Sequence, residues 1–229
     1  MKISVVIPTL DEAARIVGAV ENVIGPGVEV IVVDGGSRDE TCRLARRAGA
    51  RVLTPPAEAD CGPWGRAHQL RQGSLESTGE VVLFLHADTR LAPGWRNAVL
   101  RALADPACAG GAFRLHFAER GGFERWLAFW VAVRVALLRL PYGDQALFLR
   151  RSVLEGMGGV PAVPIMEDLD LVRGIRRTGR LALLDLPATT SARRYRAQGR
   201  LRTLLWHQLA LLGWWLGWDR ERLAARMGR

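Results

Sequence analysis

The sequence has 229 residues, and 49% of them are hydrophobic. This length and composition fit one large domain, or one domain with a C-terminal appendage. The formal net charge is +9, and Lys2 is the only lysine among the 32 basic residues. Because a bias toward arginine can reflect genome composition, the position of the charge along the chain is more informative than its size.

Cys42, Cys61 and Cys108 are odd in number and have no C-x-x-C spacing. This pattern argues against a disulfide framework and a thiolate zinc site, and it indicates a reducing compartment. The N-terminus enters a strand without the features of a secretory signal, so we expect no export. The apolar stretches at residues 126–138 and 203–218 contain polar side chains and are short for a membrane span, although they suit a membrane surface.

Up to residue 105, short apolar runs alternate with helical patterns. Continuous runs of valine and isoleucine between helices are what a parallel sheet covered on both faces requires, so we expect a βαβαβ-like arrangement. Residues 55–63 are typical of a loop, and Pro93 is expected in the first turn of a helix. The predicted strands are residues 3–7, 28–33, 51–54 and 80–85, and the predicted helices are residues 11–24, 38–48, 65–77 and 93–104.

After residue 105 the pattern changes, and no linker rich in Gly, Pro or Ser separates independent domains. We predict a catalytic domain over residues 1–190, with a nucleotide-binding half at 1–105 and an acceptor half at 106–190. A helical segment at 191–229 is expected to follow. The strands predicted in this part are residues 110–117, 146–150 and 181–185, and the helices are residues 123–140, 167–178 and one or two within 201–226.

The C-terminal segment is basic and rich in tryptophan. Residues 190–229 contain nine arginines against Asp219 and Glu221, and four of the eight tryptophans. This local charge indicates a phosphate-rich ligand or surface nearby. The tryptophans have two interpretations, a helix that packs on the core and a helix that lies at a membrane interface.

Acidic residues stand at two isolated positions where a regular element meets a loop. Asp88 follows the apolar run at residues 80–85, at the kind of strand end where open α/β sheets bind ligands. Glu167 and Asp168 stand about 80 residues further on, at the start of a helix. The pair of positions suggests a metal-bound nucleotide at the first and a base at the second.

Five motifs, taken in order, resemble those of family 2 glycosyltransferases with the GT-A fold. Each motif is weak alone, but five in the same order form a specific signal that covers most of the chain. The resemblance implies an α/β fold with a mostly parallel central sheet flanked by helices and a C-terminal helical appendage. The motifs are VVIPTLDE at residues 5–12, VVDGGSRDET at 32–41, GRA at 65–67, HAD at 86–88 and ED at 167–168.

The match is closest to a small bacterial subgroup that has HADT, PYGDQ and MED, found here at residues 86–89, 141–145 and 166–168. Some members of that subgroup are labelled by similarity as glycosyltransferases that act on carotenoid acids. This resemblance implies a lipid-like acceptor.

The resemblance places the nucleotide at the ends of the first strands. Pro8 and Thr9 end a central strand where main-chain groups and a hydroxyl would hold a base or ribose, and Glu12 belongs to the same motif. The alternative is a strand stop and helix cap, in which Thr9 or Asp11 caps and Glu12 completes the first turn. Asp34 would accept the imide N–H of uracil, or it would simply form an Asx turn.

Asp88 is the predicted metal ligand, for Mg²⁺ or Mn²⁺, because these ions bind carboxylates and bridge substrate phosphates. The family usually has Asp where His86 stands, so His86 either touches the metal or is a hydrogen-bonded imidazole at a strand end. Arg66 corresponds to a basic residue beside the nucleotide, or it is a solvated surface arginine. Arg193 and Arg194 would clamp the diphosphate, or they belong to a solvated turn or contact lipid headgroups.

By resemblance, Asp168 is the base that takes the proton of the acceptor hydroxyl, and Glu167 orients it or touches the donor sugar. The alternative is that both acids only stabilise the start of a helix. Tyr142, Asp144 and Gln145 would line the sugar or acceptor pocket, or form an ordinary turn.

The sequence therefore predicts a metal-dependent, inverting glycosyltransferase that uses a nucleotide-diphosphate sugar, UDP-linked, and an apolar or lipid-like acceptor with a hydroxyl or carboxyl group. The alternative is a nucleotide-sugar-binding protein without turnover. A nucleic-acid-binding module is disfavoured, because no zinc, RNP or recognition-helix pattern occurs. We expect a cytoplasmic protein attached peripherally to the anionic inner face of the cell membrane.

Overall fold

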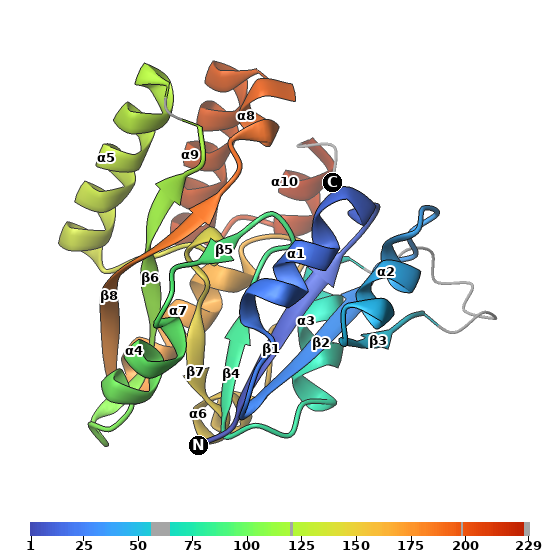
Figure 1. Ribbon diagram of the computed structural model, residues 1–229. Coiled ribbons are helices and arrows are strands. Elements are labelled where there is room, and N and C mark those ends of the chain that lie inside the picture. Colours follow the sequence, from blue (N-terminus) through green and yellow to red (C-terminus); the bar gives the residue numbers. More distant parts are fainter. Residues whose placement is uncertain (56–64, 120, 198, 227–229) are drawn as a thin grey trace.

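The computed structural model describes residues 1–55, 65–119, 121–197 and 199–226, and for Arg194 it describes the backbone alone (Figure 1). Most of the loop predicted at residues 55–63, with Cys61, lies outside these ranges. The described strands form one eight-stranded sheet in the order β3-β2-β1-β4-β7-β6-β8-β5. The strands are β1 (Ile3–Thr9), β2 (Val28–Asp34), β3 (Arg51–Leu53), β4 (Val81–Phe84), β5 (Arg90–Leu91), β6 (Cys108–Phe117), β7 (Phe148–Arg150) and β8 (Arg180–Thr190).

The sheet is mostly parallel, as predicted. Strands β3, β2, β1 and β4 run parallel to one another, and β6 runs parallel to β8. Strand β7 is antiparallel to both β4 and β6, and β5 is antiparallel to β8. Helices cover both faces of this sheet (Figure 1). They are α1 (Ala13–Val23), α2 (Thr41–Arg47), α3 (Arg66–Leu75), α4 (Trp95–Ala102), α5 (Gly122–Leu138), α6 (Arg151–Gly156), α7 (Glu167–Thr178), α8 (Arg193–Ala197), α9 (Arg200–Leu216), α10 (Arg220–Arg226) and the 3₁₀ helix η1 (Gly143–Gln145).

Alternate residues of the central strand enter two separate apolar cores. Val5 and Ile7 of β1 face a core that α1, α2 and α4 complete. Val6 faces the opposite core, to which α3, α6 and α7 contribute. Because side chains alternate across a strand, burial on both faces explains why the strands are continuous apolar runs.

Several helices begin later than the sequence predicts. Helix α1 begins at Ala13, because Asp11 has a left-handed backbone with φ of 53°. Helix α2 begins at Thr41, whose main-chain N–H is already held by the Asp39 carboxylate. The prediction that Pro93 lies in a first helical turn is wrong, because the left-handed Gly94 precedes the first residue of α4.

In the second half, β8 extends to Thr190, five residues beyond the predicted end, and its pairing with β6 shifts register between Phe113 and Arg114. Strand β7 begins at Phe148, two residues later than predicted, since the preceding residues form η1. Strand β5 and helix α6 were not predicted; both are short, and α6 follows β7 without a break.

The C-terminal helices pack against the start of α7. The carboxylate of Asp170 accepts a hydrogen bond from Trp214 Nε1 at 2.8 Å and pairs with Arg220. Beside this contact, Leu223 of α10 joins a small buried cluster with Ile165. The described helices include none that is long and apolar enough to cross a membrane.

Helix α3 approaches the sheet closely at Gly73. A methyl group at this position would lie 2.3 Å from Val6 Cγ1 and 2.8 Å from Val33 Cγ2. Glycine therefore permits the contact that brings α3 onto the ends of β1 and β2.

We expect Gly73→Ala to lower the free energy of unfolding. Overpacking a core costs about 1–3 kcal/mol, which exceeds the gain of about 1 kcal/mol that alanine normally has over glycine in a helix. Gly156→Ala is the matched control, because a methyl group there meets nothing within 4 Å. Chemical denaturation of both variants measures the difference; equal stabilities would show that α3 can move away from the sheet.

Candidate active site

The carboxyl ends of β1 and β2 lie side by side and carry two of the predicted nucleotide-binding residues. Thr9 and Asp34 are partners in the parallel register, and both are 2% exposed. The Thr9 hydroxyl lies 3.4 Å from Asp34 Oδ1, and Pro8 precedes it with intermediate exposure. These residues lie together at the strand ends, where α/β folds bind nucleotides, and would form the floor of a ligand site there.

Gln69 of α3 fixes this floor and was not predicted. Its side-chain amide donates to the main-chain oxygen of Thr9 at 2.7 Å and to that of Val33 at 2.9 Å. Strand ends leave carbonyl groups without sheet partners, and a buried carbonyl without a partner is costly. One side chain thus bonds to carbonyls of two adjacent strands, in addition to the Gly35 N–H that donates to Thr9 at 2.8 Å, and joins α3 to the sheet.

Asp34 forms the Asx turn that was one of its two interpretations. Its Oδ2 accepts the main-chain N–H of Gly36 at 2.9 Å and that of Ser37 at 2.8 Å. Gly36 has φ of 104°, a conformation that favours glycine. Its Oδ1 accepts the Ser37 hydroxyl and lies 3.4 Å from the Thr9 hydroxyl, so a base would have to displace one of these donors, and the base contact stays a prediction. Burial, together with the negative charge of Asp34, raises the pKa of the neighbouring Cys42 thiol to about 11.

Short polar side chains link the loop after β1 to the loop after β2. The Asp11 main-chain N–H donates to Ser37 Oγ at 2.8 Å, and the Asp39 carboxylate accepts the N–H groups of Ala13 and Thr41. The hydrogen bond from the Thr41 hydroxyl lowers the pKa of Asp39. The N-cap residue of α1 is Glu12, whose side chain forms no cap hydrogen bond, and Asp11 accepts the Arg38 N–H instead, so the cap interpretation of Thr9 and Asp11 is wrong.

Arg193 brings the C-terminal segment to the first part of the chain. Its guanidinium Nη2 pairs with Glu12, and its Nε lies 3.3 Å from Asp88 Oδ2. Burial lowers the pKa of Arg193, but the hydrogen bond and charge of Glu12, with Asp88, outweigh it and hold the pKa above its usual value. Thr190 adds a contact of 3.4 Å to the other oxygen of Asp88. Three predicted nucleotide-binding residues therefore meet in one charged cluster.

Asp88 and His86 follow β4, with intermediate exposure of both. Within the described ranges, no group of three or more His, Cys, Asp or Glu residues is arranged to hold a metal. Mg²⁺ is commonly held by one or two carboxylates plus substrate phosphates, so a preformed cluster is not required. The Asp88 carboxylate, at a strand end and facing a guanidinium, fits a divalent ion that arrives with a diphosphate.

A second cluster combines the start of α3, the start of α7 and η1. Arg66 Nε lies 3.1 Å from Glu167 Oε1; the Glu167 side chain is 6% exposed and that of Arg66 33%, so Arg66 is a partly buried residue paired with an acid. The Gly143 N–H donates to Asp168 Oδ2 at 2.7 Å. A methyl group on Gly143 would lie 2.2 Å from Arg66 Nη2 and 3.3 Å from Asp168 Oδ2. The two acids and the arginine are therefore held in one tightly packed arrangement.

The residues predicted to line a sugar or acceptor pocket are used in part to build this turn. Gln145 is 2% exposed, and its amide donates to the main-chain oxygen of Phe113 at 2.9 Å. Its Oε1 accepts the Tyr142 N–H at 3.3 Å, so Gln145 braces the turn. The Arg134 guanidinium lies 3.5 Å from the centre of the Tyr142 ring. Burial, with the negative charges of Asp168 and Asp144, raises the pKa of Tyr142.

Helix α3 connects the two clusters. Arg66 pairs with Glu167, and Gln69, one turn further along the helix, holds the ends of β1 and β2. Residues three apart on a helix are about 5–6 Å from each other at Cβ. The helix thus sets the spacing between the strand-end floor and the acids of α7. Arg194 lies in α8, but its side chain is outside the described part of the chain.

Comparison with known proteins agrees with this geometry. The family model "Glycosyl transferase family 2" matches residues 4–156, which is more than half of the chain. The chain belongs to glycosyl transferase family 2. A curated relative, 4,4'-diaponeurosporenoate glycosyltransferase of Staphylococcus aureus, is 34% identical over 88 residues. That alignment covers 38% of this chain and only 24% of the relative.

Solved structures of the GT-A type share the fold. A mycobacterial protein has a TM-score of 0.61 at 25% identity, with 83% of this chain and 66% of that chain covered. A mannosyltransferase from Pyrobaculum calidifontis, in complex with GDP-Man and Mn²⁺, has a TM-score of 0.60 at 20% identity and coverages of 83% and 56%. Glucosyl-3-phosphoglycerate synthase from Mycobacterium tuberculosis, in complex with Mn²⁺ and UDP, has a TM-score of 0.56 at 22% identity and coverages of 81% and 70%. The predicted GT-A fold is confirmed.

Proposed function

We propose that this protein is a metal-dependent, inverting glycosyltransferase that moves a sugar from a UDP-linked donor to a hydroxyl or carboxyl group of a lipid-like acceptor. The main observation behind the proposal is that α3 contacts both the strand-end floor and the acids at the start of α7. Gln69 holds the floor at Thr9 and Val33, and Arg66 holds Glu167 beside Asp168. A nucleotide site and a candidate base thus lie on one rigid support, as group transfer between two substrates requires.

The floor suits the nucleoside, and the charged cluster suits the diphosphate. Asp34, beside Pro8 and Thr9, would accept the imide N–H of uracil. This contact favours a UDP-sugar over nucleotide sugars whose base has no N–H at that position. Arg193 would hold phosphate oxygens with its planar guanidinium. Two of the structural relatives above were solved with nucleotides, one with UDP and one with GDP-Man.

Asp88 would hold a divalent cation, Mg²⁺ or Mn²⁺, with His86 as a neighbour at the same strand end. When bound, such a cation supplies positive charge that stabilises the departing diphosphate. Arg193 would share that work, because it already contacts Asp88. The replacement of the usual Asp by His86 leaves one negative charge fewer at the site.

Asp168 would take the proton of the acceptor hydroxyl as the acceptor oxygen attacks the anomeric carbon from the face opposite the nucleotide. For a carboxylate acceptor no proton needs to be removed, and Asp168 would then orient the sugar. The Gly143 N–H holds Asp168 Oδ2, so its orientation is set before substrate binds. Glu167, paired with Arg66, would contact the donor sugar.

Apolar side chains on α5 and α9 suggest that the acceptor is reached at a membrane surface. Trp126, Phe129 and Trp130 of α5 are at least half exposed, as are Leu201 and Leu205 of α9. The two helices lie at the same end of the sheet (Figure 1) and share a buried cluster. An aromatic and apolar surface beside basic residues is typical of peripheral membrane attachment.

Nucleotide binding by itself fits the alternative of a sugar-nucleotide-binding protein without turnover. Thermal-shift measurements with UDP, GDP, CDP and dTDP sugars, with and without Mn²⁺, identify the donor because a bound ligand raises apparent stability. Release or transfer of the sugar then separates an enzyme from a binding protein. A donor that stabilises the protein but is never cleaved, with any acceptor tried, would support the alternative.

We expect Asp88→Asn to abolish the Mn²⁺-dependent part of UDP-sugar binding and to lower turnover on the order of a hundredfold, because a carboxylate ligand is lost. Asp185→Asn is the matched control, since the Asp185 side chain is 95% exposed. Calorimetric titration of UDP with and without Mn²⁺ measures the effect. Unchanged metal-dependent binding in the first variant would exclude Asp88 as a metal ligand.

We expect Asp168→Asn to lower kcat on the order of a hundredfold while the affinity for UDP stays within a few-fold, because the change removes a base and not a donor contact. This expectation holds for a hydroxyl acceptor. Steady-state kinetics and UDP titration test it, with Asp185→Asn again as control. A parallel loss of both quantities would indicate a purely structural role, and retention of the donor's anomeric configuration would contradict a single inverting displacement.

We expect the full-length protein to sediment with vesicles of anionic lipid, and less so as the salt concentration rises, since salt screens the charges. Replacing Trp126 and Trp130 together by Gln should reduce the bound fraction, because their rings would no longer enter the interface. The control replaces Ile24 and Leu75, which are also exposed but lie on other elements. A protein that stays in the supernatant at low salt would exclude membrane attachment.

A further inference from the structure

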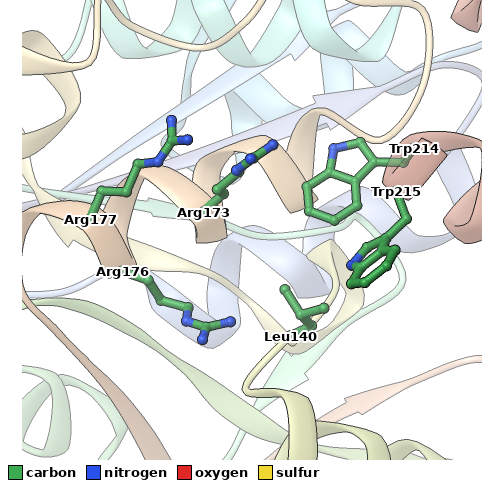
Figure 2. Close-up of a pocket in the computed structure, with 6 residues that line it drawn as sticks. All are labelled: Leu140, Arg173, Arg176, Arg177, Trp214 and Trp215. Carbon is green, nitrogen blue, oxygen red and sulfur yellow. The ribbon is translucent and has the colours of Figure 1, made fainter. Parts of the chain in front are cut away.

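A pocket of about 570 Å³ lies between α7, α9 and the end of α5 (Figure 2). Its volume is in the range of about 300–1,000 Å³ that is typical of small-molecule sites. The arginine side chains line one side and the two tryptophan rings the other (Figure 2). The lining residues are Leu140, Arg173, Arg176, Arg177, Trp214 and Trp215.

The positive charge of this pocket is not balanced by acidic side chains. Its lining includes no carboxylate, and among the described residues Arg173, Arg176 and Arg177 form no ion pair. Asp170, on the same helix, is already engaged by Trp214 and Arg220. The helix dipole favours cations in the last turn of α7, but it does not explain the indole rings that face them.

The tryptophans supply an apolar wall that is partly fixed in place. Trp214 is held by its hydrogen bond to Asp170, and the Arg173 guanidinium lies 5.7 Å from the centre of its ring. Trp215 is 76% exposed, and Leu137, three residues before Leu140 in the sequence, is 77% exposed. Leu140, which is 7% exposed, adds a small apolar area to the wall.

We propose that this pocket binds the anionic group of an amphiphile, a phosphate or carboxylate joined to an apolar chain. The guanidinium groups would hold the anion, because their donors match carboxylate and phosphate oxygens. The indole rings and Leu140 would cover the adjoining hydrocarbon. A small inorganic anion would leave the apolar wall unused, and a neutral apolar molecule would leave three charged groups facing it.

This site is distinct from the charged cluster of Glu12, Asp88 and Arg193, and the proposal does not depend on sugar transfer. It is nevertheless built on the segments that hold the candidate base. Leu140 lies three residues before Gly143, and α7 carries Asp168 in its first turn. An amphiphile in the pocket would therefore lie beside the acceptor half of the chain.

The test is calorimetric titration of the full-length protein with dodecyl phosphate below its micellar concentration. We expect binding that is at least roughly tenfold tighter than that of inorganic phosphate or of dodecyl maltoside, since each probe lacks one half of the recognition. Replacing Arg173, Arg176 and Arg177 together by Gln should weaken dodecyl phosphate binding by roughly tenfold or more. These residues are exposed, so the fold should tolerate the change.

The control replaces Arg46, Arg47 and Arg101 together by Gln, which removes the same charge from exposed positions on α2 and α4. We expect it to bind dodecyl phosphate within about twofold of the unmodified protein. Trp215→Ala should weaken dodecyl phosphate binding but leave the weak binding of inorganic phosphate unchanged. Equal binding of dodecyl phosphate and inorganic phosphate, or equal binding by the pocket variant and the control, would overturn the proposal.

Vesicles of phosphatidylglycerol distinguish the source of the ligand. Loss of both monomer and vesicle binding in the pocket variant supports the proposal with a bilayer lipid as ligand. Loss of monomer binding alone supports it with a free amphiphile as ligand. Loss of neither overturns it.

Discussion

The candidate site depends on one buried amide, the side chain of Gln69. It donates to main-chain oxygens on two adjacent strands, at Thr9 and Val33, and both bonds lie out of reach of water. The Thr9 oxygen also accepts the Gly35 N–H at 2.8 Å, and the Val33 oxygen lies 3.4 Å from the Thr9 hydroxyl. The two bonds of Gln69 add to these contacts, and a typical net gain of about 0.5–1.5 kcal/mol per hydrogen bond favours α3 at this position. Gly73 permits the close approach, and Arg66 then reaches Glu167. The spacing of the strand-end floor from the acids of α7 follows from this single anchor.

The C-terminal segment contributes side chains to the candidate site. Arg193 contacts Glu12 across 181 residues of chain and lies between it and Asp88. Asp170 holds α9 and α10 against α7 through Trp214 and Arg220. Contacts therefore cross residue 190 at two places, from Arg193 to the loops after β1 and β4 and from α9 and α10 to α7. The same contacts shape the pocket beside α7.

Patterns within short segments were sufficient to predict the parallel strands and most helices, because Val and Ile runs such as that of β1 follow directly from burial on both faces. The GT-A fold was predicted from the resemblance of five motifs to family 2 glycosyltransferases. Local patterns were not sufficient for Gln69 or for the pairing of Arg193, since nothing local marks a polar side chain whose partner lies on a distant element. Helix starts were misplaced where the Asp11 carboxylate accepts the Arg38 N–H of the next loop and the Asp39 carboxylate accepts the N–H of Thr41, the first residue of α2. The pocket is formed by residues of α7 and α9 and by Leu140 after α5. In the sequence alone, its arginines have the pattern of a solvent-exposed helix face.

The charges in the cluster of Glu12, Asp88 and Arg193 give a reason why the proposed enzyme would need a cation. Glu12 and Asp88 carry two negative charges, which are matched by Arg193 and by Arg15, whose Nη1 lies 3.2 Å from the other oxygen of Glu12. A nucleotide diphosphate that approaches the cluster brings more negative charge into a partly buried place, where repulsion is stronger than in water. The two arginines only match the two carboxylates, so the charge of the diphosphate would be left as an imbalance. A divalent ion shared by Asp88 and the phosphates would remove this imbalance, and Arg193 would then be free to turn from the carboxylates toward the phosphate oxygens.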